Sequence, residues 1–158
     1  MLENENIRLI QGDCLVVLDK LIEDGIIVDA IVTDPPYKVI SGGKPKHKGQ
    51  PSGLLSKNDG KIFTHNDLKE EDWFPKIFKL LKEGGHCYIM TNTLNLERYL
   101  RLARKTGFFF FFFLVWEKNN CTANRWYMKD CEYTLFLRKG RAKQINNVGD
   151  KTVHKFKN

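Results

Sequence analysis

The feature that most constrains the fold is an almost continuous apolar segment, residues 26–33, which stops at two consecutive prolines. Its sequence, IIVDAIVT, is rich in β-branched side chains, and such runs favour a strand buried on both faces of a parallel sheet. Pro35 and Pro36 lack backbone N–H donors and have a fixed φ, so neither a strand nor a helix continues through them. The segment therefore predicts a buried strand that ends abruptly at Asp34.

Helices and strands are predicted to alternate on both sides of this segment. Apolar residues at helical spacing predict helices, and β-branched or aromatic runs predict strands. The predicted helices are 13–24, 72–83 and 94–105, and the other strands are 7–10, 87–91, 108–116 and 133–138. This order is typical of right-handed βαβ units, so we predict an α/β fold, a mostly parallel sheet with helices on both faces. Ligands of such sheets bind beyond the carboxyl ends of the strands.

Charge is distributed unevenly along the 158 residues, whose formal net charge is +7. Residues 38–61 contain six Lys and one acidic residue, which predicts a long basic loop facing a polyanion, most often nucleic acid. A merely solvated basic surface is the alternative. The residues expected to contact phosphates are Lys38, Lys44, Lys46, His47 and Lys48 in the loop, and Lys118 and Arg125 after the Phe-rich segment.

Several classes of protein are excluded by composition. The longest apolar run, 108–116, is far shorter than the roughly 20 residues that span a bilayer. The N-terminus is acidic and has no export signal, so we expect a cytoplasmic protein that forms no membrane contact. The four cysteines show no CxxC pattern and have no His at metal spacing, so we expect reduced thiols and no metal site.

The tetrapeptide Asp34-Pro35-Pro36-Tyr37 has a specific chemical use at the end of a buried strand. A rigid backbone there presents carbonyl acceptors beside one carboxylate and one aromatic ring. This arrangement suits a planar ligand with an exocyclic amino group, whose hydrogens meet the acceptors while its ring stacks on Tyr37. The alternative is a structural turn in which Asp34 acts as a local cap. The tetrapeptide lies between a buried strand and a basic loop, and this position favours the ligand site over the structural turn.

The segment TDPPY at 33–37 resembles the catalytic signature of the DNA methyltransferases that methylate exocyclic amino groups. Further segments resemble this family in the order of its permuted subgroup, in which the catalytic half comes first. They are GDCL at 12–15, LLKEGG at 80–85, VWEKN at 115–119, CEYTLF at 131–136 and KG at 139–140.

The resemblance implies a Rossmann-like methyltransferase fold and S-adenosylmethionine as the cofactor. It implies that Asp34 and the Pro35 carbonyl accept the amino hydrogens of a base flipped out of double-stranded DNA, which stacks on Tyr37. Asp13 and Cys14, together with Asp34, would border the cofactor, although Asp13 is equally well placed to cap a helix. Asp before Pro-Pro-Tyr favours adenine N6 over cytosine N4.

The sequence departs from the family pattern at the loop that holds the methionine part of the cofactor. It contains no Phe-x-Gly-x-Gly segment, so we expect a single partial catalytic domain, 1–158, truncated after the start of the target-recognition region at 139–158. Without the missing half, the edge of the 27–32 strand would be exposed. We therefore expect that the chain self-associates, pairs with a partner chain or covers this edge with its own tail. The alternatives are a catalytically silent or vestigial DNA-binding fragment, and amino-methylation of RNA or protein.

Overall fold

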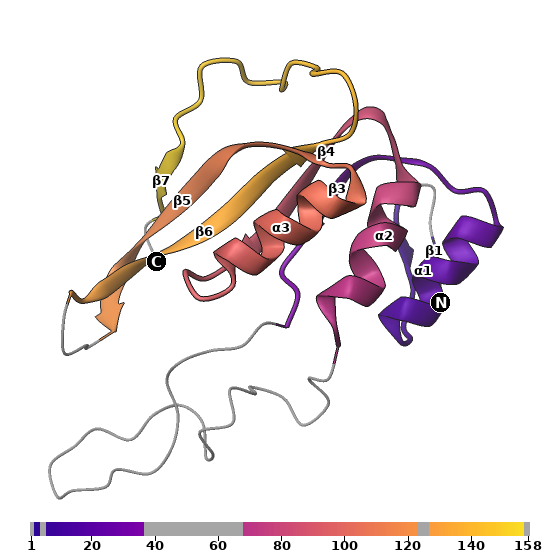
Figure 1. Ribbon diagram of the computed structural model, residues 1–158, viewed down its shortest axis with the longest axis horizontal. Coiled ribbons are helices and arrows are strands. Elements are labelled where there is room, and N and C mark those ends of the chain that lie inside the picture. Colours follow the sequence, from indigo (N-terminus) through magenta and orange to yellow (C-terminus); the bar gives the residue numbers. More distant parts are fainter. Residues whose placement is uncertain (1, 4–5, 37–67, 123–126, 157–158) are drawn as a thin grey trace, which may run out of the picture.

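The computed structural model describes residues 2–3, 6–36, 68–122 and 127–156 (Figure 1). The helices are α1 (Cys14–Glu23), α2 (Glu70–Leu80) and α3 (Leu96–Thr106). The strands are β1 (Leu2–Glu3), β2 (Arg8–Leu9), β3 (Val28–Thr33), β4 (Leu81–Thr91), β5 (Phe109–Thr122), β6 (Lys129–Arg138) and β7 (Val153–Lys155). None of the helices in these ranges has the length and apolarity that crossing a bilayer requires.

Five strands form one sheet in the order β3-β4-β6-β5-β7. Strand β3 pairs with β4 in parallel, β6 is antiparallel to both β4 and β5, and β7 pairs with β5 in parallel. Four of these five strands therefore share one direction, and the insertion of β6 makes the sheet mixed. The prediction of an α/β fold with a mostly parallel sheet is confirmed. Strand β2 lies outside this sheet and pairs with β1.

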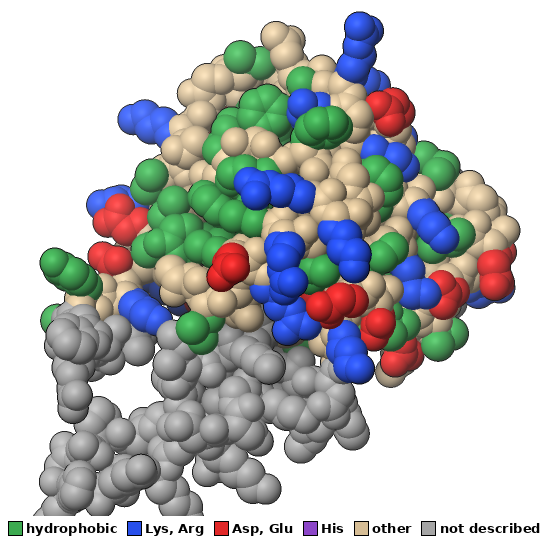
Figure 2. All heavy atoms as spheres, in the orientation of Figure 1, with side chains coloured by type: hydrophobic (Ala, Val, Ile, Leu, Met, Phe, Trp, Pro, Cys, Tyr) green, Lys and Arg blue, Asp and Glu red, His purple; other side chains and the backbone are tan. Residues whose placement is uncertain are grey.

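The three helices form one layer against one face of the sheet, in the order α1, α2, α3. Between this layer and the sheet lies the core, in which Trp73 and Phe74 stack with ring centroids 4.4 Å apart. From the sheet, Cys87 and Ile89 of β4 and Leu137 of β6 are fully buried in the same cluster. Figure 2 shows one face of the molecule, with hydrophobic side chains over β5 and β6 and Lys and Arg side chains over α2 and α3.

The opposite face of the sheet, named here the open face, carries no helix in the described ranges. Tyr88 of β4 pairs with Phe136 of β6, and their rings stack 4.9 Å apart. Val32 of β3 lies beside Tyr88 and is 68% exposed, and Phe112 of β5 lies beside Phe136 and is also exposed. The prediction of helices on both faces therefore holds for one face only, because all three helices between the strands pack on the same side.

The strand that ends at Asp34 lies at an edge of the sheet rather than at its centre. Strand β3 has β4 as its neighbour on one side, and Ile27 and Val32 are 60% and 68% exposed. The predicted burial on both faces is wrong here, whereas the predicted exposed edge is observed. The strand formed by the tail, β7, pairs with β5 at the opposite edge, so it does not cover β3.

The boundary between α2 and β4 differs from the predicted one. The helix starts at Glu70, with Asp72 in its first turn rather than at its cap, and it contains Pro75. It ends at Leu80, and the following residue is already extended (φ −78°, ψ 132°). Apolar spacing alone predicts three further helical residues, because it does not register the long-range contacts of β4. Helix α3, in contrast, ends as predicted at Gly107, which adopts φ 110°.

Candidate functional site

One edge of the sheet collects the ends of several strands. Strands β3, β4 and β5 end there and β6 begins there, since Thr91 pairs with Tyr133 and Trp116 with Glu132. The carboxyl end of β3 and the N-terminal ends of α1 and α2 lie on the same side of the molecule (Figure 1). The structure therefore brings the predicted catalytic segment to the edge where α/β sheets bind their ligands.

Asp34 follows the last residue of β3 at this edge. Its neighbour Thr33 pairs in parallel with Ile89, which brings Asp34 level with Met90 of β4. Pro35, which is buried, and Pro36, which is exposed, follow Asp34, and their rings fix the backbone on the carboxyl side. Partial burial raises the pKa of the Asp34 carboxyl group above its ordinary value, and the negative charge of Glu132 raises it further. Asp34 is thus a carboxylate with increased affinity for a proton.

Glu132 is itself part of an ion pair. Its carboxylate binds the Lys118 ammonium group, which also lies 5.3 Å from the centroid of the Trp116 ring. The Lys118 side chain, for which phosphate contact was predicted, is therefore partly neutralised within the fold. Sequence reasoning missed Glu132, because nothing in the chain signals that β5 and β6 form a hairpin that places it near Asp34.

Two cavities open at this edge. One, of about 310 Å³, is lined by residues that follow β4 and begin β6, including Asn92, Tyr127 and Tyr133. The other, of about 280 Å³, lies between β4, β6, β5 and the chain after β7, and its lining includes Met90, Trp116 and Glu132. A cavity of about 340 Å³ between α2 and α3 belongs to the helix layer, away from Asp34.

The turn after β4 is fixed by an asparagine. Asn92 accepts hydrogen bonds at its Oδ1 from the Leu94 amide (3.0 Å) and from Asn95 Nδ2 (2.7 Å). Before it, Thr91 is fully buried, and its hydroxyl group has no hydrogen-bond partner among the described residues. The position of this polar turn directly after a buried strand was visible in the sequence, but its internal hydrogen bonds were not.

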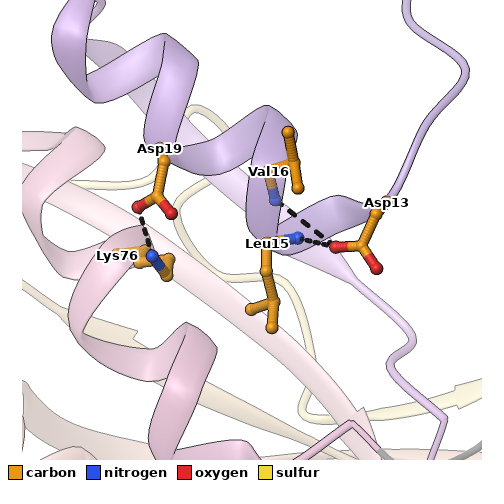
Figure 3. A network of polar contacts seen from close by, with 5 residues as sticks. All are labelled: Asp13, Leu15, Val16, Asp19 and Lys76. Carbon is orange, nitrogen blue, oxygen red and sulfur yellow. Dashed lines mark hydrogen bonds and ion pairs between the residues drawn. The ribbon is translucent and has the colours of Figure 1, made fainter.

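Asp13 caps helix α1. Its Oδ1 accepts hydrogen bonds from the amides of Leu15 (2.8 Å) and Val16 (3.3 Å), as Figure 3 shows. In the same view Asp19 of α1 forms an ion pair with Lys76 of α2, which joins the two helices. The capping role of Asp13 is thereby established in the fold. Within the described residues, Asp13 Oδ2 takes no part in the cap, and Cys14, the first residue of α1, is exposed at this helix end.

The other predicted site residues lie outside the part of the chain that the structure describes. They are Tyr37, Lys38, Lys44, Lys46, His47, Lys48 and Arg125. In the described ranges, no group of three or more His, Cys, Asp or Glu side chains could hold a metal ion.

The comparison with known proteins covers most of the chain. Residues 28–157 match the N6/N4 methyltransferase family, described as DNA methylase. The type II methyltransferase M2.LlaDCHI of Lactococcus lactis subsp. cremoris is 25% identical over 159 residues, which cover 98% of this chain and 58% of that protein.

Solved structures share the fold at low sequence identity. The complex of M1.HpyAVI with S-adenosylmethionine (SAM) matches with a TM-score of 0.65 and 21% identity, over 91% of this chain and 60% of that one. TTHA0409 of Thermus thermophilus, described as a DNA modification methylase, matches with a TM-score of 0.53 and 20% identity, over 87% and 56%. The chain thus spans about three fifths of the length of these relatives. Because the family match extends over far more than half of its residues, the chain belongs to the N6/N4 DNA methylase family.

Proposed function

We propose that the chain carries the catalytic half of a DNA methyltransferase that methylates an exocyclic amino group of a flipped-out base. The observation that carries this proposal is the position of Asp34 and Pro35 at the carboxyl end of β3, in a chain of the DNA methylase family. Asp before Pro-Pro-Tyr resembles enzymes that act on adenine N6, so we favour adenine over cytosine N4. We propose that this reaction takes place in the cytoplasm.

The residues of the chain would act by positioning and electrostatics. The Asp34 carboxylate and the Pro35 carbonyl group would accept the two amino hydrogens, which directs the nitrogen lone pair toward the methyl donor. The ring of Tyr37 would stack on the base and repay part of the few kcal/mol that unstacking costs. No covalent intermediate with the protein is required, so the site needs no nucleophilic cysteine.

S-adenosylmethionine, which M1.HpyAVI binds in its crystal structure, is the methyl donor that this proposal assigns. The N-terminus of α1 is suited to one end of it, because Asp13 uses Oδ1 for the cap and, within the described residues, its Oδ2 takes no part in that cap, next to the exposed Cys14. The methionine end has no such match in the described ranges: the glycines with positive φ there, such as Gly107 and Gly140, occupy turns. We infer that residues beyond those described complete the cofactor site.

We infer that a further polypeptide segment packs against β3 and the open face. Among the described residues no strand pairs with the outer edge of β3, and the open face exposes Val32 (68%), Phe109 (53%) and Phe111. Edges and faces of this kind are normally covered in folded proteins. We propose that either the remaining two fifths of a methylase domain or a second copy of the chain covers them. Sedimentation velocity of the purified chain separates the two: a dimer supports the second copy, and a monomer at high micromolar concentration contradicts it and favours the remaining part of a methylase domain.

A catalytically silent DNA-binding protein is the second candidate, favoured by the lack of a Phe-x-Gly-x-Gly segment. Incubation of the protein with duplex DNA and S-adenosylmethionine labelled in the methyl group separates the two. Hydrolysis of the DNA to nucleosides should give labelled N6-methyldeoxyadenosine, whereas labelled N4-methyldeoxycytidine would show that cytosine is the target base. Binding of DNA without any transfer, even after addition of the missing half, would support the silent protein.

A further inference from the structure

Asp34 and Glu132 lie on the same face of the sheet at the same edge. Val32 lies beside Tyr88 on the open face, and because side chains alternate along a strand, Asp34 is directed to that face as well. On β6, Phe136 belongs to the open face, so Thr134 and Glu132 do too. The two carboxylates therefore lie on one face, on either side of β4, at the edge where β3 ends and β6 begins.

The position of Glu132 is fixed by its neighbours on β5. It stands opposite Trp116 in the β5–β6 pairing, and Lys118, two residues further along β5, forms the ion pair with it. Both side chains of the pair are about two thirds buried or more, and the Lys118 ammonium lies against the Trp116 ring. Glu132 also lines the cavity of about 280 Å³ that contains Met90, the residue level with Asp34.

Within the described ranges, the other charged groups of this edge come from β5, β6 and β7. Glu117 of β5 forms an ion pair with Lys155 of β7, and Lys129 and Asp130 are the first two residues of β6. No charged side chain of β4 lies between Asp34 and Glu132, since the residues there are Met90, Thr91 and Asn92. Glu132 is the charged group whose repulsion adds to the effect of burial on the pKa of Asp34.

We propose that Glu132 is a positioning residue for the Asp34 carboxylate and that Lys118 sets the strength of its effect. This inference rests on the proposed function and deepens it. A like charge nearby makes Asp34 bind hydrogen-bond donors and protons more strongly, and the Lys118 ammonium, which is paired with Glu132, offsets part of that charge.

A more basic Asp34 would help to remove the proton that the amino nitrogen must lose during methylation. When the amino nitrogen forms its bond to the methyl carbon, the carbon–sulfur bond breaks and its electron pair stays on the sulfur of the sulfonium donor. The nitrogen is then positively charged until one of its N–H protons moves to a carboxylate oxygen of Asp34. A carboxylate destabilised by Glu132 accepts that proton more readily.

The test is an NMR titration of the Asp34 side-chain carboxyl carbon in the purified chain. Glu132→Gln removes the repelling charge and should lower the titration midpoint of Asp34. Lys118→Met removes the compensating charge and should raise it. Glu117→Gln is the matched control, because Glu117 pairs with Lys155 and should leave the midpoint unchanged. Circular dichroism of each variant establishes that it is folded.

Opposite shifts in the Glu132 and Lys118 variants, with none in the control, support the proposal. An unchanged midpoint in both, or an equal shift in the control, overturns it. If Glu132→Gln does not fold, the direction of the Lys118→Met shift decides alone, and a fall or no change overturns the proposal. The titration is read without methyl transfer, so the failure of this inference and the failure of the proposed function are distinguishable.

Discussion

Lys139, directly after β6, donates a hydrogen bond of 2.7 Å from its Nζ to the carbonyl oxygen of Leu81. A second hydrogen bond of 2.8 Å reaches the carbonyl oxygen of Phe78, and the ammonium lies 4.7 Å from the Phe78 ring. Carbonyl groups at the end of a helix lack partners within the helix, and a cation is favoured there. This contact explains why α2 ends at Leu80, although helical residues continue in the sequence pattern.

We expect Lys139→Met to destabilise the fold by about 1–3 kcal/mol, because two carbonyl groups lose a charged donor. The measurement is the free energy of unfolding from urea denaturation. Lys151→Met, at an exposed position of the 139–152 segment, is the control and should change it by less than about 0.5 kcal/mol. Equal effects of the two variants would mean that Lys139 does not hold the end of α2.

Two substitutions at Asp13 separate its capping role from a role in cofactor binding. Asp13→Ala removes both amide hydrogen bonds and should cost about 1 kcal/mol of stability, whereas Asp13→Asn keeps an equivalent acceptor and should cost little. Thermal unfolding measures the first effect. Weaker S-adenosylmethionine binding by the stable Asn variant would reveal a contact of the carboxylate with the cofactor, and unchanged binding would leave Asp13 with the cap alone.

Cysteine reactivity follows from burial. Cys87 is fully buried in the core, and this burial raises the pKa of its thiol to about 12. Only the thiolate reacts with iodoacetamide, so Cys87 should remain unlabelled in the native protein at pH 8 and react after unfolding. The exposed Cys14 and Cys121 should react at once. Mass spectrometry of peptides measures the labelling. If Cys87 of the native protein is labelled as fast as Cys14 and Cys121, its place in the core is contradicted.

Sequence patterns predicted those parts of the fold that depend on local chemistry. Gly107 ends α3 because a left-handed residue suits a helix end, and Asp13 starts α1 because its side chain caps amides. The strand before Asp34 was predicted, and so was its exposed edge, but the order of the other strands was not, since strand order depends on pairing across the chain.

The site was predictable to the same extent. Asp34 stands out by the prolines that follow it, whereas the link between Glu132 and Lys118 depends on the register of β5 against β6. Registers of this kind follow from packing between distant segments, which spacing along the chain does not encode. The same limitation explains why the ion pair of Lys118 was not predicted, and its contact with DNA stays a prediction.

The basic segment 38–61 lies outside the described residues, and its predicted role is tested in solution. If its lysines contact phosphates, neutralising Lys44, Lys46 and Lys48 together should reduce the slope of log affinity against log salt by about 0.9 for each lost duplex contact. Affinity should fall to the same extent for unrelated DNA sequences. Fluorescence anisotropy at several salt concentrations measures this, and an unchanged slope would mean that the segment is a solvated surface.

The central claim is that Asp34 receives the amino group of the target base, and Asp34→Ala tests it most directly. In the complete or reconstituted enzyme, we measure methyl transfer to duplex DNA under single-turnover conditions together with DNA affinity. The account predicts that transfer is abolished while affinity changes little, because phosphate contacts dominate binding. Near-normal transfer by the Asp34→Ala protein would contradict the account and remove Asp34 from the mechanism.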